Sequence, residues 1–319
     1  MGSELNRRSF VKGSVLASAG AALAAGTAGK PSAEAADAPA AGPTASENAL
    51  PKGKIGEMEI SRILLGGNLL THYTHSRDLK YVYNLAKHYN TDEKIMDTMQ
   101  VAEENGIDTL VIHNPPSAIA VLRRYRRERG GKMKWIICPT APVEPGLEKY
   151  TQAVQQLIDE GADAIYLWGV RADALVGQAK MDLVAEAVEV AKAQGVPSGV
   201  GAHKLDVMVG CEKNNVDSDF YIKTLHHHKY PSAKLNHDSM WCDKPEETVE
   251  FMATVKKPWI AFKVMAAGAI PPQNAFQYVF ENGADFSLAG MFDYEIAEDV
   301  RIARQVLAKV TTRNRPWYG

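Results

Sequence analysis

The sequence is poor in the features that mark small disulfide-rich, nucleic-acid-binding or Rossmann-type proteins. Only three cysteines occur in 319 residues, and their scattered positions predict neither a disulfide scaffold nor a cysteine-based metal site. The formal net charge of -2 argues against binding to nucleic acid or to an anionic membrane surface. No Gly-x-Gly-x-x-Gly motif follows the first predicted strand, where a Rossmann fold would place it. What remains is a globular protein with one large domain or two modest ones.

The N-terminal segment has the composition of an export signal. Residues 6–12 read NRRSFVK, an Ala/Gly-rich apolar run follows, and a small-residue triplet stands at 33–35. This resembles a twin-arginine (Tat) signal peptide, whose pattern is Ser/Thr-Arg-Arg-x-Phe-Leu-Lys; Asn6 and Val11 depart from it. We expect residues 1–35 to direct export by the Tat machinery to the periplasm or the extracellular space. An ordinary secretory signal or a short membrane anchor is the alternative, although the apolar run is too short to span a bilayer.

The rest of the chain alternates between strand-like and helical patterns. Residues 36–54 have the composition of a flexible linker, and residues 55–319 are expected to fold as one domain. Eight short apolar, β-rich runs occur near 61–67, 107–113, 134–138, 163–168, 198–203, 219–225, 258–265 and 284–291. Strands that are apolar throughout are typical of a parallel sheet covered on both faces. Eight strand–helix units predict an α/β fold, a (β/α)8 TIM barrel; an open doubly wound sheet is the alternative.

The segments after three of these strands predict the walls of a site, because barrel active sites lie at the C-terminal ends of the strands. Residues 68–94, after the first strand, form a connection far longer than usual, which indicates a lid or pocket wall; a surface insertion without a role is the alternative. The Gly-rich segments AAGAI and LAGMFD follow the last two strands, where barrels bind phosphate through backbone amides. Glycines at these positions also simply make tight turns.

Three consecutive histidines, His226, His227 and His228, follow the sixth predicted strand. Because side chains alternate along a strand, we expect at least one of them to point into the barrel mouth. His203 ends the neighbouring strand, and His237 lies in the loop after the triplet. His203, His226 and His237 are therefore predicted to hold a divalent metal such as zinc, manganese or iron. The alternative is a set of histidines that hydrogen-bond loops.

Lys263 lies in an apolar run near the end of the seventh predicted strand. A lysine there must find a partner or water, and in a desolvated site it could form a Schiff base with a carbonyl substrate or stabilise an enolate. We predict Lys263 as a catalytic residue, with Asp238 or His113 moving the proton. An ion pair between Lys263 and a nearby carboxylate is the alternative.

Several segments between residues 55 and 205 resemble the layout of aldo-keto reductases: IGEMEISRILLGG, GIDTLVIH, GADAIYLWGV and AQGVPSGVGAH. The resemblance implies the barrel fold and, for a reductase with an altered site, an NAD(P) cofactor. The family's catalytic tetrad does not carry over. Its strand-two Asp aligns with Val111 and its strand-four His with Trp168, while its Lys falls near 138–140 and its Tyr falls in the segment NPPS.

These features together predict an exported enzyme that acts on a small polar carbonyl compound, a sugar or its keto derivative. The expected chemistry is metal- or lysine-assisted proton abstraction in a lyase, isomerase or aldolase type of step. Two alternatives stay open: an NAD(P)-dependent reductase and a non-catalytic periplasmic ligand-binding barrel. A small-molecule substrate is expected, with no nucleic-acid partner and no stable membrane insertion.

Overall fold

The computed structural model describes residues 49–234, 238 and 241–319. Eight parallel strands close into a barrel in which each strand pairs with the next along the chain and the last pairs with the first. The strands are β3 (Ile63–Gly66), β4 (Thr109–His113), β5 (Lys134–Cys138), β6 (Ala164–Leu167), β7 (Ser198–Ala202), β8 (Phe220–Thr224), β9 (Trp259–Phe262) and β10 (Phe286–Ala289). The predicted TIM barrel is confirmed, and each predicted strand lies where the sequence indicates it.

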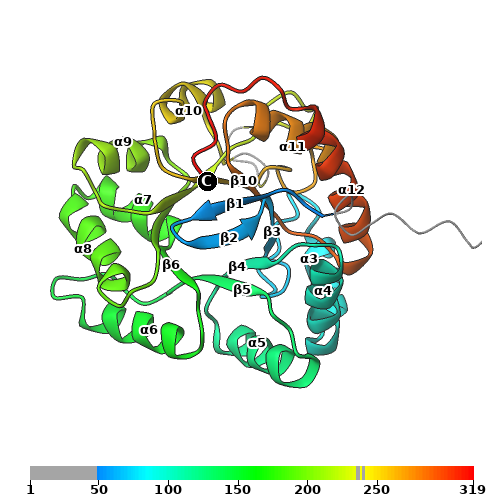
Figure 1. Ribbon diagram of the computed structural model, residues 1–319, viewed down its shortest axis with the longest axis horizontal. Helices are drawn as coiled ribbons and strands as arrows, with labels where there is room; N and C mark the ends of the chain where they lie inside the picture. The colour runs from blue at the N-terminus through cyan, green and yellow to red at the C-terminus, as the bar shows by residue number, and fades with distance from the viewer. Residues whose placement is uncertain (1–48, 235–237, 239–240) are drawn as a thin grey trace, which may run out of the picture. The chain divides into compact units, whose positions relative to one another are not determined.

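Helices surround this barrel (Figure 1). They are α3 (Lys80–Tyr89), α4 (Asp92–Glu104), α5 (Pro116–Arg129), α6 (Glu148–Asp159), α7 (Gly169–Gly177), α8 (Met181–Lys192), α9 (Leu205–Lys213), α10 (Pro245–Met252), α11 (Pro272–Glu281) and α12 (Asp293–Lys309). Within the described part of the chain, no helix combines the length and apolar character needed to cross a membrane.

The barrel strands are buried on both faces, which explains their apolar sequences. Side chains such as Leu64, Ile136, Phe220 and Phe286 fill the barrel interior. Their sequence neighbours point outward and pack, together with the helices, in a larger apolar layer. The alternation of side chains along each strand therefore divides one apolar run between two cores.

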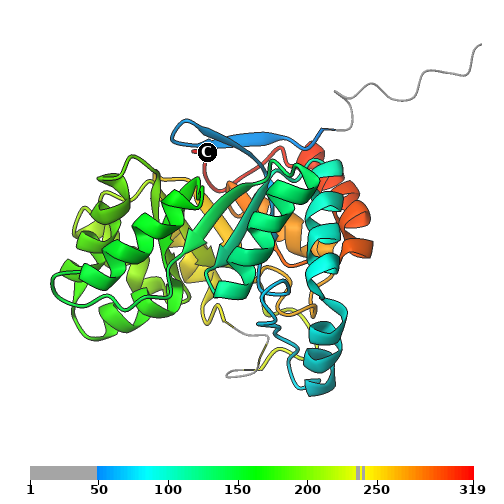
Figure 2. The same ribbon diagram turned by 90° about the horizontal axis from the view of Figure 1, so that it is seen from below.

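The N-terminal end of the barrel is closed by a hairpin of β1 (Lys52–Ile55) and β2 (Met58–Ser61). Ile55 and Ile60 of this hairpin are fully buried and join the interior cluster. Figure 2 shows the hairpin and α3 at opposite ends of the barrel. Since β1 begins at Lys52, the predicted linker at 36–54 overlaps this strand.

Three helices lie in segments that the sequence pattern did not assign to helices. The long connection after β3 contains α3, the segment after β6 contains α7, and α12 follows β10. Helix α7 is short and lies close to β7, because Gly169 and Gly201 let the two backbones approach. A Cβ atom at Gly201 would lie 2.9 Å from the backbone nitrogen of Gly169. Short glycine-bounded helices have too few turns to show a clear period.

Candidate functional site

A cavity of about 800 Å³ opens at the C-terminal ends of the barrel strands. Its walls come from the long connection after β3, from the ends of the barrel strands, and from the segments that follow β9 and β10. His113, His203 and Lys263, three of the predicted site residues, line it. Residues 68–69, 73–77, 79 and 82 also line it, so the long connection is a pocket wall, one of the two roles predicted for it.

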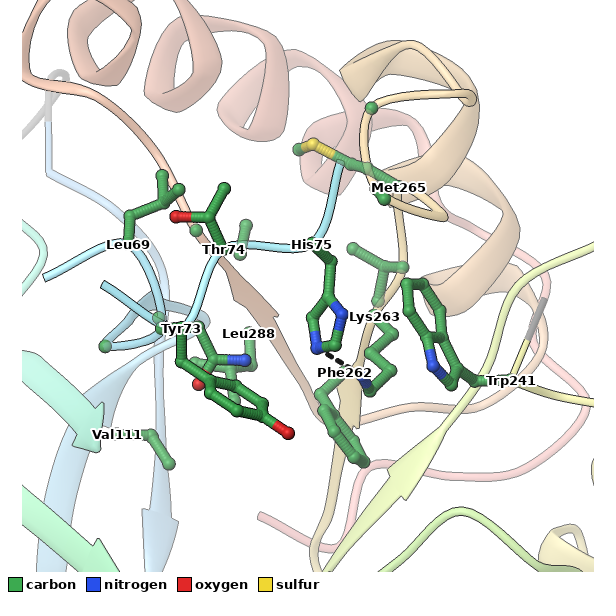
Figure 3. A pocket seen from close by; sticks show the side chains of 18 of the residues that line it. Leu69, Tyr73, Thr74, His75, Val111, Trp241, Phe262, Lys263, Met265 and Leu288 are labelled. Atoms are coloured by element: carbon green, nitrogen blue, oxygen red, sulfur yellow. Dashed lines mark hydrogen bonds between the residues drawn. The ribbon is translucent and has the colours of Figure 1, made fainter. Parts of the chain in front are cut away.

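Lys263 forms one end of a hydrogen-bonded chain of three side chains. Its Nζ lies 3.1 Å from Nε2 of His75, and Nδ1 of His75 lies 2.9 Å from Oδ1 of Asp238. The same Nζ lies 3.8 Å from the centre of the Trp241 ring, a cation–π distance. Figure 3 shows the lysine side chain between the imidazole and the indole. An amine, an imidazole and a carboxylate are therefore connected by two successive hydrogen bonds.

Burial controls the charge states in this chain. Desolvation lowers the pKa of Lys263 to about 7, and the negative charge of Asp238 opposes that shift only in part. Desolvation and then the nearby Lys263 charge lower the pKa of His75 below its ordinary value. A neutral His75 donates its Nδ1 proton to Asp238 and accepts a hydrogen bond from Lys263 at Nε2, a tautomer inferred from these partners. Lys263 can therefore gain or lose a proton near neutral pH.

Backbone strain accompanies this chemistry. Lys263 has a φ of 55°, and Ala266 and Ala267 have φ values of 47° and 54°, although none of them is glycine. Residues with side chains rarely adopt this left-handed region, and such outliers cluster at functional sites. In the connection after β3, His72 and Arg77 also have positive φ. The two segments that supply Lys263 and His75 are therefore both locally strained.

Asp238 connects two loops. Besides His75, it accepts hydrogen bonds from the backbone N–H groups of Ser76 at 2.8 Å and Arg77 at 2.7 Å. It thereby fixes the His75 segment against the loop after β8. Lys263 and Asp238 are candidates from the sequence alone, whereas His75 lies in a long loop without a motif of its own and Trp241 carries no sequence signal. The length of the connection after β3 is the one signal that pointed toward His75.

His113 lies on another part of the cavity wall. Its ring stacks on Trp168 at 6.5 Å with an interplanar angle of 7°, and the Tyr73 ring meets it edge-on at 5.9 Å. Burial lowers its pKa below the ordinary value. These ring contacts make His113 part of an aromatic wall, and they give no direct path for a proton from the Lys263 amine.

The histidine triplet does not point into the cavity, contrary to the expectation from strand alternation. His226 is fully buried, and its Nε2 accepts hydrogen bonds from the backbone N–H groups of Trp241 at 3.0 Å and Cys242 at 3.2 Å. His228 hydrogen-bonds the Cys242 carbonyl oxygen at 2.6 Å. The strand ends at Thr224, so the alternation stops before the triplet. His226 and His228 instead hydrogen-bond the backbone of the loop that contains Trp241, and Trp241 in turn contacts Lys263.

Two of the predicted metal ligands, His203 and His226, have separate hydrogen-bond partners. His203 lines the cavity, but its Nδ1 is paired with Asp173 at 2.8 Å, whereas His226 is occupied with the backbone and does not line the cavity. His237 lies outside the described residues. Among the residues that the structure describes, no group of three or more His, Cys, Asp or Glu side chains could hold a metal ion. The geometry of His226 fits the loop-binding alternative instead.

Comparison with known proteins gives a likeness in fold. The sequence matches no protein-family model, and no curated relative is found for it. Solved structures do match. A Pseudomonas aeruginosa protein assigned to the aldo-keto reductases has 17% identity and a TM-score of 0.56, with 81% of this chain and 94% of that chain covered. The holo form of an aldo-keto reductase from Bacillus halodurans has 13% identity and a TM-score of 0.55, with 82% and 96% covered.

These matches confirm the predicted remote resemblance to the aldo-keto reductase barrel. They contradict the predicted reaction, because the matching barrels bear the name of reductases. The prediction of a lyase, isomerase or aldolase step by metal- or lysine-assisted proton abstraction is therefore wrong. The position of a lysine at a barrel mouth does not by itself distinguish these reactions from a proton transfer that accompanies reduction.

Proposed function

We propose that this protein is an NAD(P)-dependent oxidoreductase that interconverts a carbonyl group and an alcohol on a small polar substrate. The observation that carries the proposal is the chain formed by Lys263, His75 and Asp238 at the cavity wall. Carbonyl reduction needs a proton for the substrate oxygen, and a group with a pKa near the working pH is the most effective donor. The likeness in fold to proteins named as aldo-keto reductases supports the same reaction class.

The cavity has features that suit a nicotinamide cofactor. The Thr74 hydroxyl lines it and is buried without a hydrogen-bond partner among the described residues, so it can bond a carboxamide. Gly268 also lines it, and a Cβ atom there would meet nothing within 4 Å, which leaves its backbone open to a phosphate group. Thr74 and the turn at Gly268 would hold the cofactor. When bound, it supplies hydride chemistry at the carbon of a carbonyl or alcohol.

Lys263 is the proton donor in this proposal. A protonated lysine has three N–H groups; one reaches His75 and the cationic head lies against the Trp241 ring. A remaining N–H can donate to the substrate oxygen as the alcohol forms. After the transfer the amine is neutral, and burial makes that state accessible near pH 7. For alcohol oxidation the neutral amine accepts the hydroxyl proton.

His75 and Asp238 position the lysine. Asp238 holds the imidazole through Nδ1, which directs the Nε2 lone pair toward Lys263 Nζ. His203 and Phe262 pack nearby, with their rings 5.4 Å apart, and help to exclude water from the amine. This arrangement performs the role that a tyrosine or histidine donor fulfils in other reductases, with a lysine as the group that titrates.

A Lys263→Met variant tests the proposal. Turnover of a panel of aldehydes, ketones and keto sugars with NADH and NADPH should fall about 10²–10⁴-fold, the usual loss for a general acid. Nucleotide binding, followed by nicotinamide fluorescence, should change little. Lys132→Met is the matched control, because Lys132 is exposed and does not line the cavity. Unchanged turnover in Lys263→Met, or absence of binding of either nucleotide to the wild-type protein, would overturn the proposal.

A further inference from the structure

One part of the cavity wall has no role in the proton-transfer chain. It is made by Phe292 after β10 and by Glu295 and Asp299 on α12. Glu295 and Asp299 are four residues apart and therefore lie on the same face of the helix. The wall thus combines an aromatic side chain with two carboxyl groups.

Asp299 is unusual because its side chain is buried without a partner among the residues that the structure describes. The residue is 6% exposed and lines the cavity, yet within the described part of the chain it forms no hydrogen bond or ion pair. Burial, followed by the negative charges of Glu295 and Glu298, raises its pKa to about 6. A buried carboxyl group is costly unless a donor satisfies it. The missing donors can come from a ligand in the cavity.

Glu295 adds a second acceptor and a second negative charge to this wall. Its Oε2 accepts a hydrogen bond from the Phe292 backbone N–H at 2.9 Å, which fixes the carboxylate at the start of α12. The cationic side chains among the described lining residues are Arg77 and Lys263, apart from the histidines. Arg77 donates to Ser232 at 2.9 Å, and Lys263 belongs to the proton-transfer chain. Neither of them belongs to the wall formed with α12.

An aromatic side chain beside paired carboxyl acceptors fits a nucleoside. A purine ring can pack on Phe292, while vicinal ribose hydroxyls donate hydrogen bonds to carboxylates. A phosphate on the ribose 2′-oxygen would place two further negative charges against Glu295 and Asp299. Sites that accept such a phosphate supply an arginine for it.

We propose that Asp299 and Glu295 bind the adenosine ribose of the cofactor and select NAD(H), which has free ribose hydroxyls, over NADP(H). This inference rests on the proposed oxidoreductase function and names the cofactor form that the same cavity takes. Asp299 is the main discriminating residue, because it is the buried carboxyl that lacks another partner.

Equilibrium binding of NADH and NADPH tests the proposal without any substrate. Dissociation constants are measured by nicotinamide fluorescence on the full protein and on Asp299→Asn and Glu295→Gln. The wild-type protein should bind NADH at least about tenfold more tightly than NADPH, the size of effect that one unpaired charge contact produces. Asp299→Asn should reduce that ratio to about one-third or less of its value by improving NADPH binding. Asparagine keeps the shape of the side chain, and Glu295→Gln keeps an acceptor for Phe292, so both variants should fold.

Glu298→Gln is the matched control. Glu298 precedes Asp299 on α12 and pairs with Arg301, but it does not line the cavity, so the preference should stay unchanged. Equal or tighter binding of NADPH to the wild-type protein would overturn the inference and leave the proposed oxidoreductase intact. A preference for NADH that survives both Asp299→Asn and Glu295→Gln would also overturn it. Binding of neither nucleotide would overturn the proposed function as well.

Discussion

The titration of Lys263 is the most direct measure of the proposed site. Its pKa is lowered from an ordinary value of 10.5 to about 7, mainly by desolvation. A shift of this size corresponds to about 5 kcal/mol between the two protonation states. The Asp238 charge raises the pKa, so Asp238→Asn should lower it further.

The consequence for catalysis has a definite sign. Carbonyl reduction needs the protonated amine, so its rate should be level below pH 7 and fall about tenfold per pH unit above it. Alcohol oxidation needs the neutral amine, and its rate should rise through the same range. Lys263→Arg should remove the fall above pH 7, because arginine stays protonated.

The pKa can be measured before a substrate is known. Trace acetylation over a pH series, read by mass spectrometry of the peptide that contains Lys263, gives the fraction of neutral amine at each pH. The exposed Lys149 serves as an internal reference in the same sample. A midpoint near 10.5 for Lys263 would refute the reasoning, since it would mean that the amine is hydrated and not desolvated among His75 and Trp241.

Three further predictions concern other parts of the molecule. His226→Ala should lower the free energy of unfolding by about 1–3 kcal/mol in urea, because it leaves two backbone N–H groups without an acceptor; a loss below about 0.5 kcal/mol would contradict that role. Asp285→Ala should cost about 3–5 kcal/mol in the same assay, since it leaves the fully buried Arg315 without its carboxylate; a stability equal to wild type would contradict it. We also propose that the N-terminal segment is a Tat signal: replacing Arg7 and Arg8 by lysine should keep the protein in the cytoplasm in a fractionation experiment, and continued export would exclude this route.

The barrel could be read from the sequence because its signals are local. Each strand is a short apolar run between turn-forming residues, and each such run needs only its own neighbours to be recognised. The same local pattern predicts Lys263 near the C-terminal end of a strand. In a barrel of parallel strands, all the C-terminal ends lie at the same face. His113, His203 and Lys263 therefore line the cavity as a consequence of position alone.

The partners of these residues could not be read in the same way. His75 and Lys263 are 188 positions apart, and no local pattern indicates which histidine of the chain meets the amine. The triplet at 226–228 was conspicuous in the sequence but lies beyond the strand. There His226 accepts hydrogen bonds from backbone N–H groups of the next loop, and His228 bonds a carbonyl oxygen of that loop. Helix α3 was missed because its buried surface is small; Ala86 is its buried residue.

The sequence by itself determined the fold class and the end of the barrel at which chemistry can occur, since both follow from periodicity along the chain. Only the tertiary structure decided that Lys263 is desolvated between His75 and Trp241 and that Asp299 is buried without a partner among the described residues. Desolvation and hydrogen bonding depend on which atoms of distant segments become neighbours. These neighbours are brought together only when the loops at the C-terminal ends of the strands fold against one another.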